Sequence, residues 1–220
     1  MSRVSTRVLL SGGIVGSIGF VAAFLILGAV RPGYDPMRQF VSLLSLGEGG
    51  TAMTIAFLVC GLLILGAAIG LRRVLHPGIA CRWAPVMVGL AGLGLVIAGT
   101  FPTDPVQGYP PGTPLEMPAT ASWHAILHLT GALFFFAGLP IASFFLARRF
   151  AVGGERRWAA YSISSGLIMI LANAVTSAAP GTVGLVPDVA GLLQRISISV
   201  GLVWLAVVSA RFLRDSPALR

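Results

Sequence analysis

Six long apolar segments constrain this chain more than any other feature of its sequence. Each is close to the length of about 20 residues with which a helix crosses the hydrocarbon core of a membrane. The segments cover residues 8–30, 51–71, 83–101, 122–147, 158–178 and 189–213. The sequence therefore predicts an all-α protein: one bundle of six transmembrane helices, with residues 1–220 as a single integral membrane domain.

The composition indicates that lipid is the solvent for much of this chain. Hydrophobic residues make up 56% of it and charged residues only 10%, whereas a soluble domain is about a quarter charged. The formal net charge is +8, but no basic stripe with interleaved aromatic residues is present. We therefore expect membrane lipids as partners, and no nucleic acid.

The arginines predict the orientation of the bundle. Cytoplasmic loops of membrane proteins carry an excess of basic residues. Twelve of the fifteen basic residues fall on one side of the predicted membrane, and only Arg31 and Arg38 fall in loops on the other side. The twelve are Arg3, Arg7, Arg72, Arg73, Arg82, Arg148, Arg149, Arg156, Arg157, Arg211, Arg214 and Arg220. This distribution predicts that both termini lie in the cytoplasm.

The loops on the outer side are distinctive. Residues 31–50 and 102–121 form long loops rich in proline and glycine, and residues 180–188 form a shorter one. Within the first of them, residues 40–46 are apolar enough for a short interfacial or re-entrant helix, in which Ser42 and Ser45 would share a face. Inside the predicted helices small residues are dense, as at Gly92 and Gly94, and this pattern predicts a close approach of the helix backbones.

Two histidines open the fourth segment. His124 and His128 are four residues apart, which places both on one face of a helix. An ionisable residue inside a membrane segment is a functional-site hypothesis by default. The spacing suits metal ligands, so zinc or another divalent metal held by His124, His128 and Asp104 is one option. No other cofactor is expected.

Polar residues of three segments are predicted to lie at one depth below the outer surface. At 1.5 Å per helical residue, His128, Asn173 and Arg195 are roughly 8–10 Å from the outer ends of their segments. Gln194 adjoins Arg195, and Asp104 emerges at the top of the third segment. An arginine in mid-membrane costs about 2.5–3.5 kcal/mol, so we expect Arg195 to face inward and pair with an acid. The candidates for that acid are, in order, Asp104, Asp35, Glu48 and Asp188.

Several interpretations of this polar layer are open. It can be a buried ion pair that fixes helix packing, or a site for a lipid head group or a small molecule with anionic or zwitterionic character. It can also belong to a metal-assisted intramembrane hydrolase acting on a lipid-like substrate; transport has less support because the polar residues share one depth. No G-x-S-x-G motif and no P-loop is present. The candidate ligand-binding residues are His124, His128, Asn173, Gln194, Arg195, Asp104, Asp35 and Ser42. Neither catalytic activity nor oligomeric state follows from the sequence.

Several short motifs resemble a known family. They are Gly33-Tyr34-Asp35-Pro36, Gln39-Phe40-Val41-Ser42, Phe101-Pro102-Thr103-Asp104, the pair His124 and His128, and Gln194-Arg195. Together they resemble the bacterial membrane family called domain of unknown function 998. This resemblance implies a six-helix integral membrane protein, and it implies no particular activity. A more distant likeness is to six-helix membrane proteins of the Frag1/DRAM type, and the serine, the aspartate and the histidine pair are similar to those of membrane hydrolases related to alkaline ceramidases.

Overall fold

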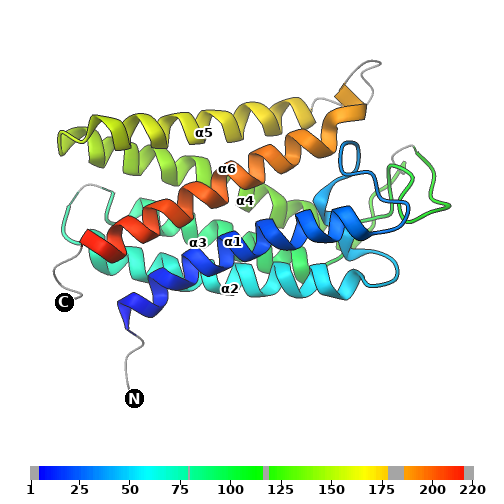
Figure 1. Cartoon of the computed structure of the whole chain (residues 1–220), viewed down its shortest axis with the longest axis horizontal. Coiled ribbons are helices and arrows are strands. Elements are labelled where there is room, and N and C mark those ends of the chain that lie inside the picture. The colour runs from blue at the N-terminus through cyan, green and yellow to red at the C-terminus, as the bar shows by residue number, and fades with distance from the viewer. Residues whose placement is uncertain (1–4, 79, 116–118, 178–185, 216–220) are drawn as a thin grey trace.

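The structure is a computed structural model that describes residues 5–78, 80–115, 119–177 and 186–215 of the chain (Figure 1). It contains six long helices and one short 3-10 helix. They are α1 (Thr6–Val30), η1 (Val41–Ser45), α2 (Gly50–Leu75), α3 (Trp83–Thr100), α4 (Trp123–Val152), α5 (Arg156–Ser177) and α6 (Val186–Asp215). All six long helices are long and apolar enough to cross a membrane. The predicted all-α fold is confirmed, and so is a short helix in the first long loop.

Some helices extend beyond the apolar segments that predicted them. α2 continues to Leu75 through Arg72 and Arg73, and α4 continues to Val152 through Arg148 and Arg149. The predicted segments ended at their first charged residue, because charge is unfavourable in lipid. The helices continue further, because arginine is a good helix former and its charge is favourable near a helix C-terminus. α6 begins three residues before the predicted segment, with Asp188 in its first turn. Arg3, Arg220, residue 178 and most of the loop 180–188 lie outside the described residues.

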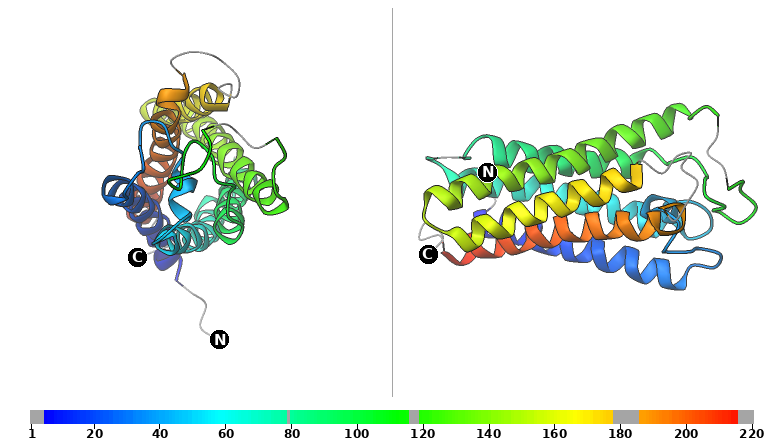
Figure 2. Two further views of the ribbon diagram at one scale, coloured as in Figure 1. Left: turned by 90° about the vertical axis from the view of Figure 1, so that its right-hand side faces the viewer. Right: turned by 90° about the horizontal axis from the view of Figure 1, so that it is seen from above.

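The six helices form a closed ring. Each helix packs against its neighbours in the chain, and α6 packs against α1 to close the circle (Figure 2). α1 begins and α6 ends at the same end of the bundle (Figure 1), which we call the terminal end. The loop of residues 31–49 and the described parts of the second long loop, residues 101–115 and 119–122, lie at the opposite end, the loop end (Figure 1). η1 belongs to the first of these loops and packs against α1, α2 and α6.

Glycines set the spacing between neighbouring helices on one side of the ring. A Cβ atom added to Gly94 of α3 would lie 2.3 Å from the carbonyl oxygen of Gly131 on α4. A Cβ atom at Gly61 of α2 would lie 2.7 Å from the carbonyl oxygen of Gly92 on α3. No side chain fits at such distances, so the backbones touch directly. The predicted close approach at Gly92 and Gly94 is confirmed.

The outward faces of the ring are apolar. Large side chains such as Val15, Leu62, Leu133 and Leu171 are more than half exposed. The buried polar side chains instead point between helices, as in the hydrogen bond from Trp204 Nε1 on α6 to Ser162 Oγ on α5. An apolar exterior of this extent is the arrangement expected of a protein surrounded by lipid.

Candidate functional site

The first long loop, residues 31–49, folds back into the mouth of the ring. The chain leaves α1 at Arg31, reverses direction at Gly33, where φ is +71°, and enters η1 at Val41. Val41, Leu43 and Leu44 of η1 are at most 1% exposed. Burying an apolar side chain contributes about 1.5–3 kcal/mol, so these three side chains alone hold η1 firmly in the loop end of the ring.

Arg195 of α6 fastens this loop from inside the bundle. Its guanidinium donates through Nη1 to the carbonyl oxygens of Pro36 (2.6 Å) and Gln39 (2.9 Å). It also donates through Nη2 to the Tyr34 hydroxyl, and its Cζ lies 5.3 Å from the centre of that ring. Arg195 is only 6% exposed. The guanidinium therefore faces inward, as predicted from its cost in lipid.

The predicted acidic partner of Arg195 is wrong. Within the described part of the chain, no carboxylate forms an ion pair with it. Asp188 pairs with Arg38 instead, and the Asp35 carboxylate accepts a hydrogen bond from the Met37 amide. A non-helical loop has carbonyl oxygens that no helix uses, and these oxygens replace the carboxylate. Glu48 also contributes a backbone carbonyl, which accepts a hydrogen bond from Arg31.

Tyr34 completes the contact between the loop and α6. Its hydroxyl lies 3.1 Å from the carbonyl oxygen of Gln39 and 3.0 Å from that of Phe40. Burial raises the pKa of Tyr34 to about 12, against the opposing effect of the neighbouring Arg195 charge. The phenol therefore keeps its proton at neutral pH and donates to the loop carbonyls while accepting from Arg195.

Further hydrogen bonds tie the same loop to α6 and to the second long loop. Gln194 Oε1 accepts from the amide of Val41 (2.8 Å), at the start of η1. The amides of Gly191 and Leu192 donate to loop carbonyls. From the second loop, the Gln107 side chain accepts from the amide of Phe40 (3.1 Å). At a net contribution of about 0.5–1.5 kcal/mol for each hydrogen bond, these contacts make the loop an integral part of the fold.

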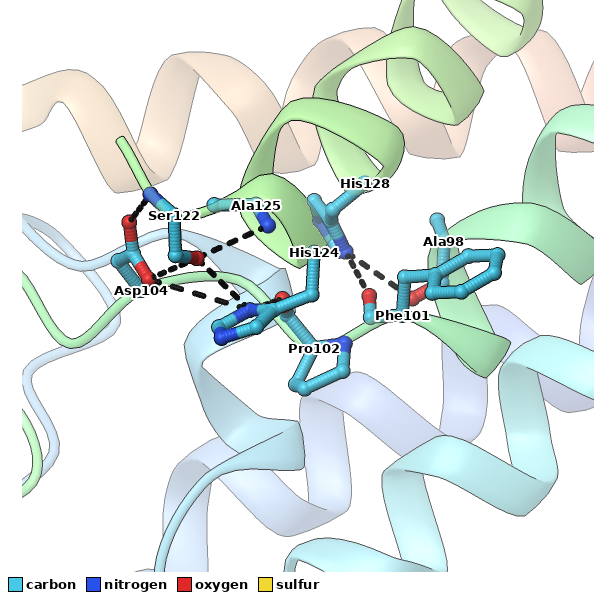
Figure 3. Close-up of polar contacts among 8 residues, drawn as sticks. All are labelled: Ala98, Phe101, Pro102, Asp104, Ser122, His124, Ala125 and His128. Carbon is cyan, nitrogen blue, oxygen red and sulfur yellow. Dashed lines mark hydrogen bonds and ion pairs between the residues drawn. The ribbon is translucent and has the colours of Figure 1, made fainter. Parts of the chain in front are cut away.

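His124 belongs to a network at the corner between α3 and α4 (Figure 3). Ser122 is the N-cap of α4, and its hydroxyl accepts from the amide of Ala125 and donates to Asp104 Oδ1 (2.6 Å). His124 Nδ1 lies 2.9 Å from the Ser122 hydroxyl and 3.0 Å from the carbonyl oxygen of Pro102. The two hydrogen bonds from Ser122 lower the pKa of Asp104. The Ser122 hydroxyl thus donates to a carboxylate and caps a helix, so Asp104, Ser122 and His124 form a structural corner. Their order differs from that of a catalytic triad, in which the histidine lies between the aspartate and the serine.

His128 points into the bundle one turn further along α4. Its Nδ1 lies 3.0 Å from the carbonyl oxygen of Ala98 and 2.9 Å from that of Phe101, both at the end of α3 (Figure 3). Both partners are acceptors, so Nδ1 carries a hydrogen in this arrangement. The second ring nitrogen, Nε2, is then an acceptor in the neutral imidazole. His128 is 4% exposed.

His124 and His128 make separate sets of contacts: His124 lies beside Ser122 and Asp104, and His128 contacts the end of α3. Across the described residues, no group of three or more histidine, cysteine, aspartate and glutamate side chains is arranged to hold a metal ion. His124 and His128 each use Nδ1 on a different part of the α3–α4 corner. The pair of histidines that suggested a metal from its spacing thus fixes the end of α3 against α4.

A small cavity lies inside the ring beneath η1. Its volume is about 40 Å³, which is room for a few water molecules. Three polar side chains line it, Ser42 from η1, His128 from α4 and Gln194 from α6. Its apolar walls include Phe20, Phe57, Phe135 and Phe136. Three of the candidate residues named from the sequence thus meet at one cavity.

The other candidates lie elsewhere. Arg195 binds the loop, Asp35 is part of the loop turn, and His124 and Asp104 form the α3–α4 corner. Asn173 of α5 is not among the residues that line the cavity. Sequence reasoning missed the roles of Tyr34, Gln39 and Gln107. Tyr34 and Gln39 stand in the two motifs on which the family resemblance partly rested, but nothing in the sequence marked Gln107.

Six apolar helices with lipid-compatible outer faces define a multi-pass membrane protein. The chain belongs to the DUF998 family, described as proteins of unknown function, whose model matches residues 14–211. The resemblance inferred from the short motifs is thereby confirmed. No curated protein and no solved structure matches the chain.

Proposed function

We propose that this chain is a bacterial plasma-membrane protein that binds the neutral polar group of a small ligand in the cavity beneath η1, with both its termini in the cytoplasm. The orientation is supported by the arginines, because those of the α2–α3 and α4–α5 connections lie at the terminal end of the bundle. The loop end then faces the outside of the cell. The observation that carries the binding proposal is the convergence of Ser42, His128 and Gln194 on one cavity.

The lining supplies complementary hydrogen-bonding groups. His128 Nε2 is an acceptor, because Nδ1 already donates to the end of α3. Gln194 has its Oε1 occupied by the Val41 amide, which leaves its amide hydrogens as donors toward the cavity. The Ser42 hydroxyl can act in either role. A hydroxyl or carbonyl group of a ligand, surrounded by the phenylalanine rings, matches this set.

The electrostatics favour a neutral ligand group over the anionic or zwitterionic group considered from the sequence. Among the described residues that line the cavity there is no aspartate, glutamate, lysine or arginine. Arg195, the cation expected to attract an anion, is not among them and binds loop carbonyls. Moving an ion into such an apolar space without a counter-charge costs far more than moving a neutral polar group.

The experiment compares 1-hexanol with 1-fluorohexane, which share a chain and differ in the hydroxyl group. Both are titrated into the purified protein in lipid nanodiscs, with ¹⁵N-labelled histidine and NMR detection of the ring nitrogens. We expect 1-hexanol to shift the His128 Nε2 resonance and 1-fluorohexane to leave it in place. The variant His128→Phe assigns the resonance, and Gln194→Leu should weaken the response to 1-hexanol.

Equal effects of both compounds, or none from either, would contradict binding through a hydroxyl group at His128. Movement of the His124 resonance alone would place any interaction at the α3–α4 corner instead. Zinc chloride is added in a separate titration as a probe of the metal alternative. Saturable shifts of His124 and His128 together with zinc would favour the hydrolase hypothesis over the proposal.

A further inference from the structure

The roof of the cavity is η1. Val41 and Ser42 line the cavity, while Leu43 and Leu44 next to them are fully buried. η1 packs against α1, α2 and α6 and sits within the ring when the bundle is viewed along its length (Figure 2, left). η1 therefore lies between the cavity and the loop end of the bundle.

The contacts that hold η1 come from several directions. α6 supplies the amides of Gly191 and Leu192 and the side chains of Gln194 and Arg195. The second long loop supplies Gln107. Arg31, at the end of α1, donates to the carbonyl oxygens of Leu44 and Gly49, on the other side of η1. η1 is thus held by hydrogen bonds at both ends, and its apolar side chains are buried between them. This arrangement is that of a plug in the ring, in contrast to a flap that is attached at one end only.

The interior is also closed toward the terminal end. Beyond the cavity the ring is filled by side chains that are completely buried, among them Ile64, Leu139, Leu202 and Trp204. These residues come from α2, α4 and α6 and belong to one continuous apolar core. Water at the terminal end therefore has no direct path to His128.

We infer that η1 plugs the loop end of the bundle, so that the ligand of the cavity arrives through the bilayer and is a membrane-dissolved amphiphile. This inference rests on the proposed function for the existence of a ligand. The plug itself stands on the contacts of η1 alone. It also argues against transport of a water-soluble molecule along the axis of the ring.

The test measures access to a cysteine placed at Ser42. Cys60→Ala and Cys81→Ser remove the native thiols, and Ser42→Cys adds one at the cavity. The protein in nanodiscs, whose two faces both meet water, is treated with the charged reagent MTSES or its small neutral relative methyl methanethiosulfonate. The exposed Thr120 of the second loop gives the control variant Thr120→Cys.

We expect both reagents to label the control, and only the neutral reagent to label Ser42→Cys at a comparable rate. The charged reagent should be at least about tenfold slower at Ser42→Cys than at the control. Adding Tyr34→Phe, which removes one fastening hydroxyl without a change of shape, should raise the rate with the charged reagent. This variant avoids the risk that an Arg195 variant fails to fold.

Labelling of Ser42→Cys by MTSES at the control rate would overturn the plug. Labelling by neither reagent, in protein whose thermal unfolding matches that of the parent, would overturn access through the bilayer. The labelling pattern does not depend on any ligand, so it can support the plug even where the 1-hexanol titration fails. The two proposals therefore fail separately.

Discussion

Two arginines on α6, the buried Arg195 and the partly buried Arg211, find partners for their charge in different ways. Arg195, near the loop end, donates to backbone carbonyls and to the Tyr34 hydroxyl, with no carboxylate among its partners in the described residues. Arg211, at the terminal end, pairs with the carboxylate of Glu155, and Asp215 lies 3.7 Å from its Nε. Its Cζ also lies 4.4 Å from the centre of the Trp158 ring and 4.8 Å from that of Phe150.

The difference follows from the backbone around each residue. A long irregular loop surrounds Arg195, and its carbonyl oxygens are available because no helix uses them. At the terminal end the chain turns tightly from α4 into α5, and most nearby carbonyls are bonded within helices. Side chains must then neutralise Arg211. The comparison shows that a membrane-embedded arginine does not require an acid when a folded loop is within reach.

Replacing Arg195 by leucine should produce the largest effect on stability. The carbonyl oxygen of Pro36 would lose its Arg195 donor, and that of Gln39 would keep only the Tyr34 hydroxyl. A buried carbonyl without a donor costs about 1–3 kcal/mol, and the Tyr34 hydroxyl would also lose the hydrogen bond that it accepts from Arg195. We expect a loss of about 3 kcal/mol or more in the free energy of unfolding, measured by titration with sodium dodecyl sulfate in mixed micelles. Arg38→Leu is the matched control, because it breaks the exposed ion pair with Asp188 and should cost less than about 1 kcal/mol. Similar losses in the two variants would show that Arg195 does not hold the loop.

Replacing Arg211 by leucine should cost less, about 1–2 kcal/mol. The Glu155 carboxylate is 38% exposed, so water can solvate it after the change, and the ring contacts contribute about 0.5–2 kcal/mol. Unlike the Arg195 variant, this one should lose less in 0.5 M sodium chloride, because salt already weakens the pair with Glu155 in the parent protein. Arg214→Leu, at an 84% exposed side chain, is the control. A loss at Arg211 as large and as salt-independent as the loss at Arg195 would remove the contrast between the two ends.

The fold could be predicted because a transmembrane helix needs about 20 consecutive, mostly apolar residues, and such segments can be read directly from a sequence. Six apolar segments of spanning length allow little else, and the inward direction of Arg195 followed from its cost in lipid. The partner of Arg195 could not be predicted in the same way. Every residue has a carbonyl oxygen, so nothing in the sequence distinguishes Pro36 and Gln39 as acceptors, whereas each aspartate stands out.

The cavity was only partly predictable. Counting residues from the ends of the segments gave the height of His128, Asn173 and Arg195, but not their direction around each helix axis. His128 faces the cavity, Asn173 does not line it, and Arg195 faces the loop. Ser42 reaches the cavity because η1 enters the ring, which depends on long-range packing and not on the local sequence.

The smallest predicted effect is a loss of stability at alkaline pH that depends on Tyr34 at the loop end and not on Arg211 at the terminal end. Tyr34 has a pKa of about 12 in the folded protein, above its ordinary value of 10. Its hydroxyl therefore contributes fully below pH 10, and this contribution is lost as the pH rises through about 12. Tyr34→Phe should cost about 1 kcal/mol at pH 8 and should show a smaller further loss than the parent between pH 10 and 12. Thermal unfolding followed by tryptophan fluorescence measures both. Arg211→Leu should keep the alkaline loss of the parent, because its network does not include Tyr34; an equal alkaline loss in Tyr34→Phe would show that another group causes it.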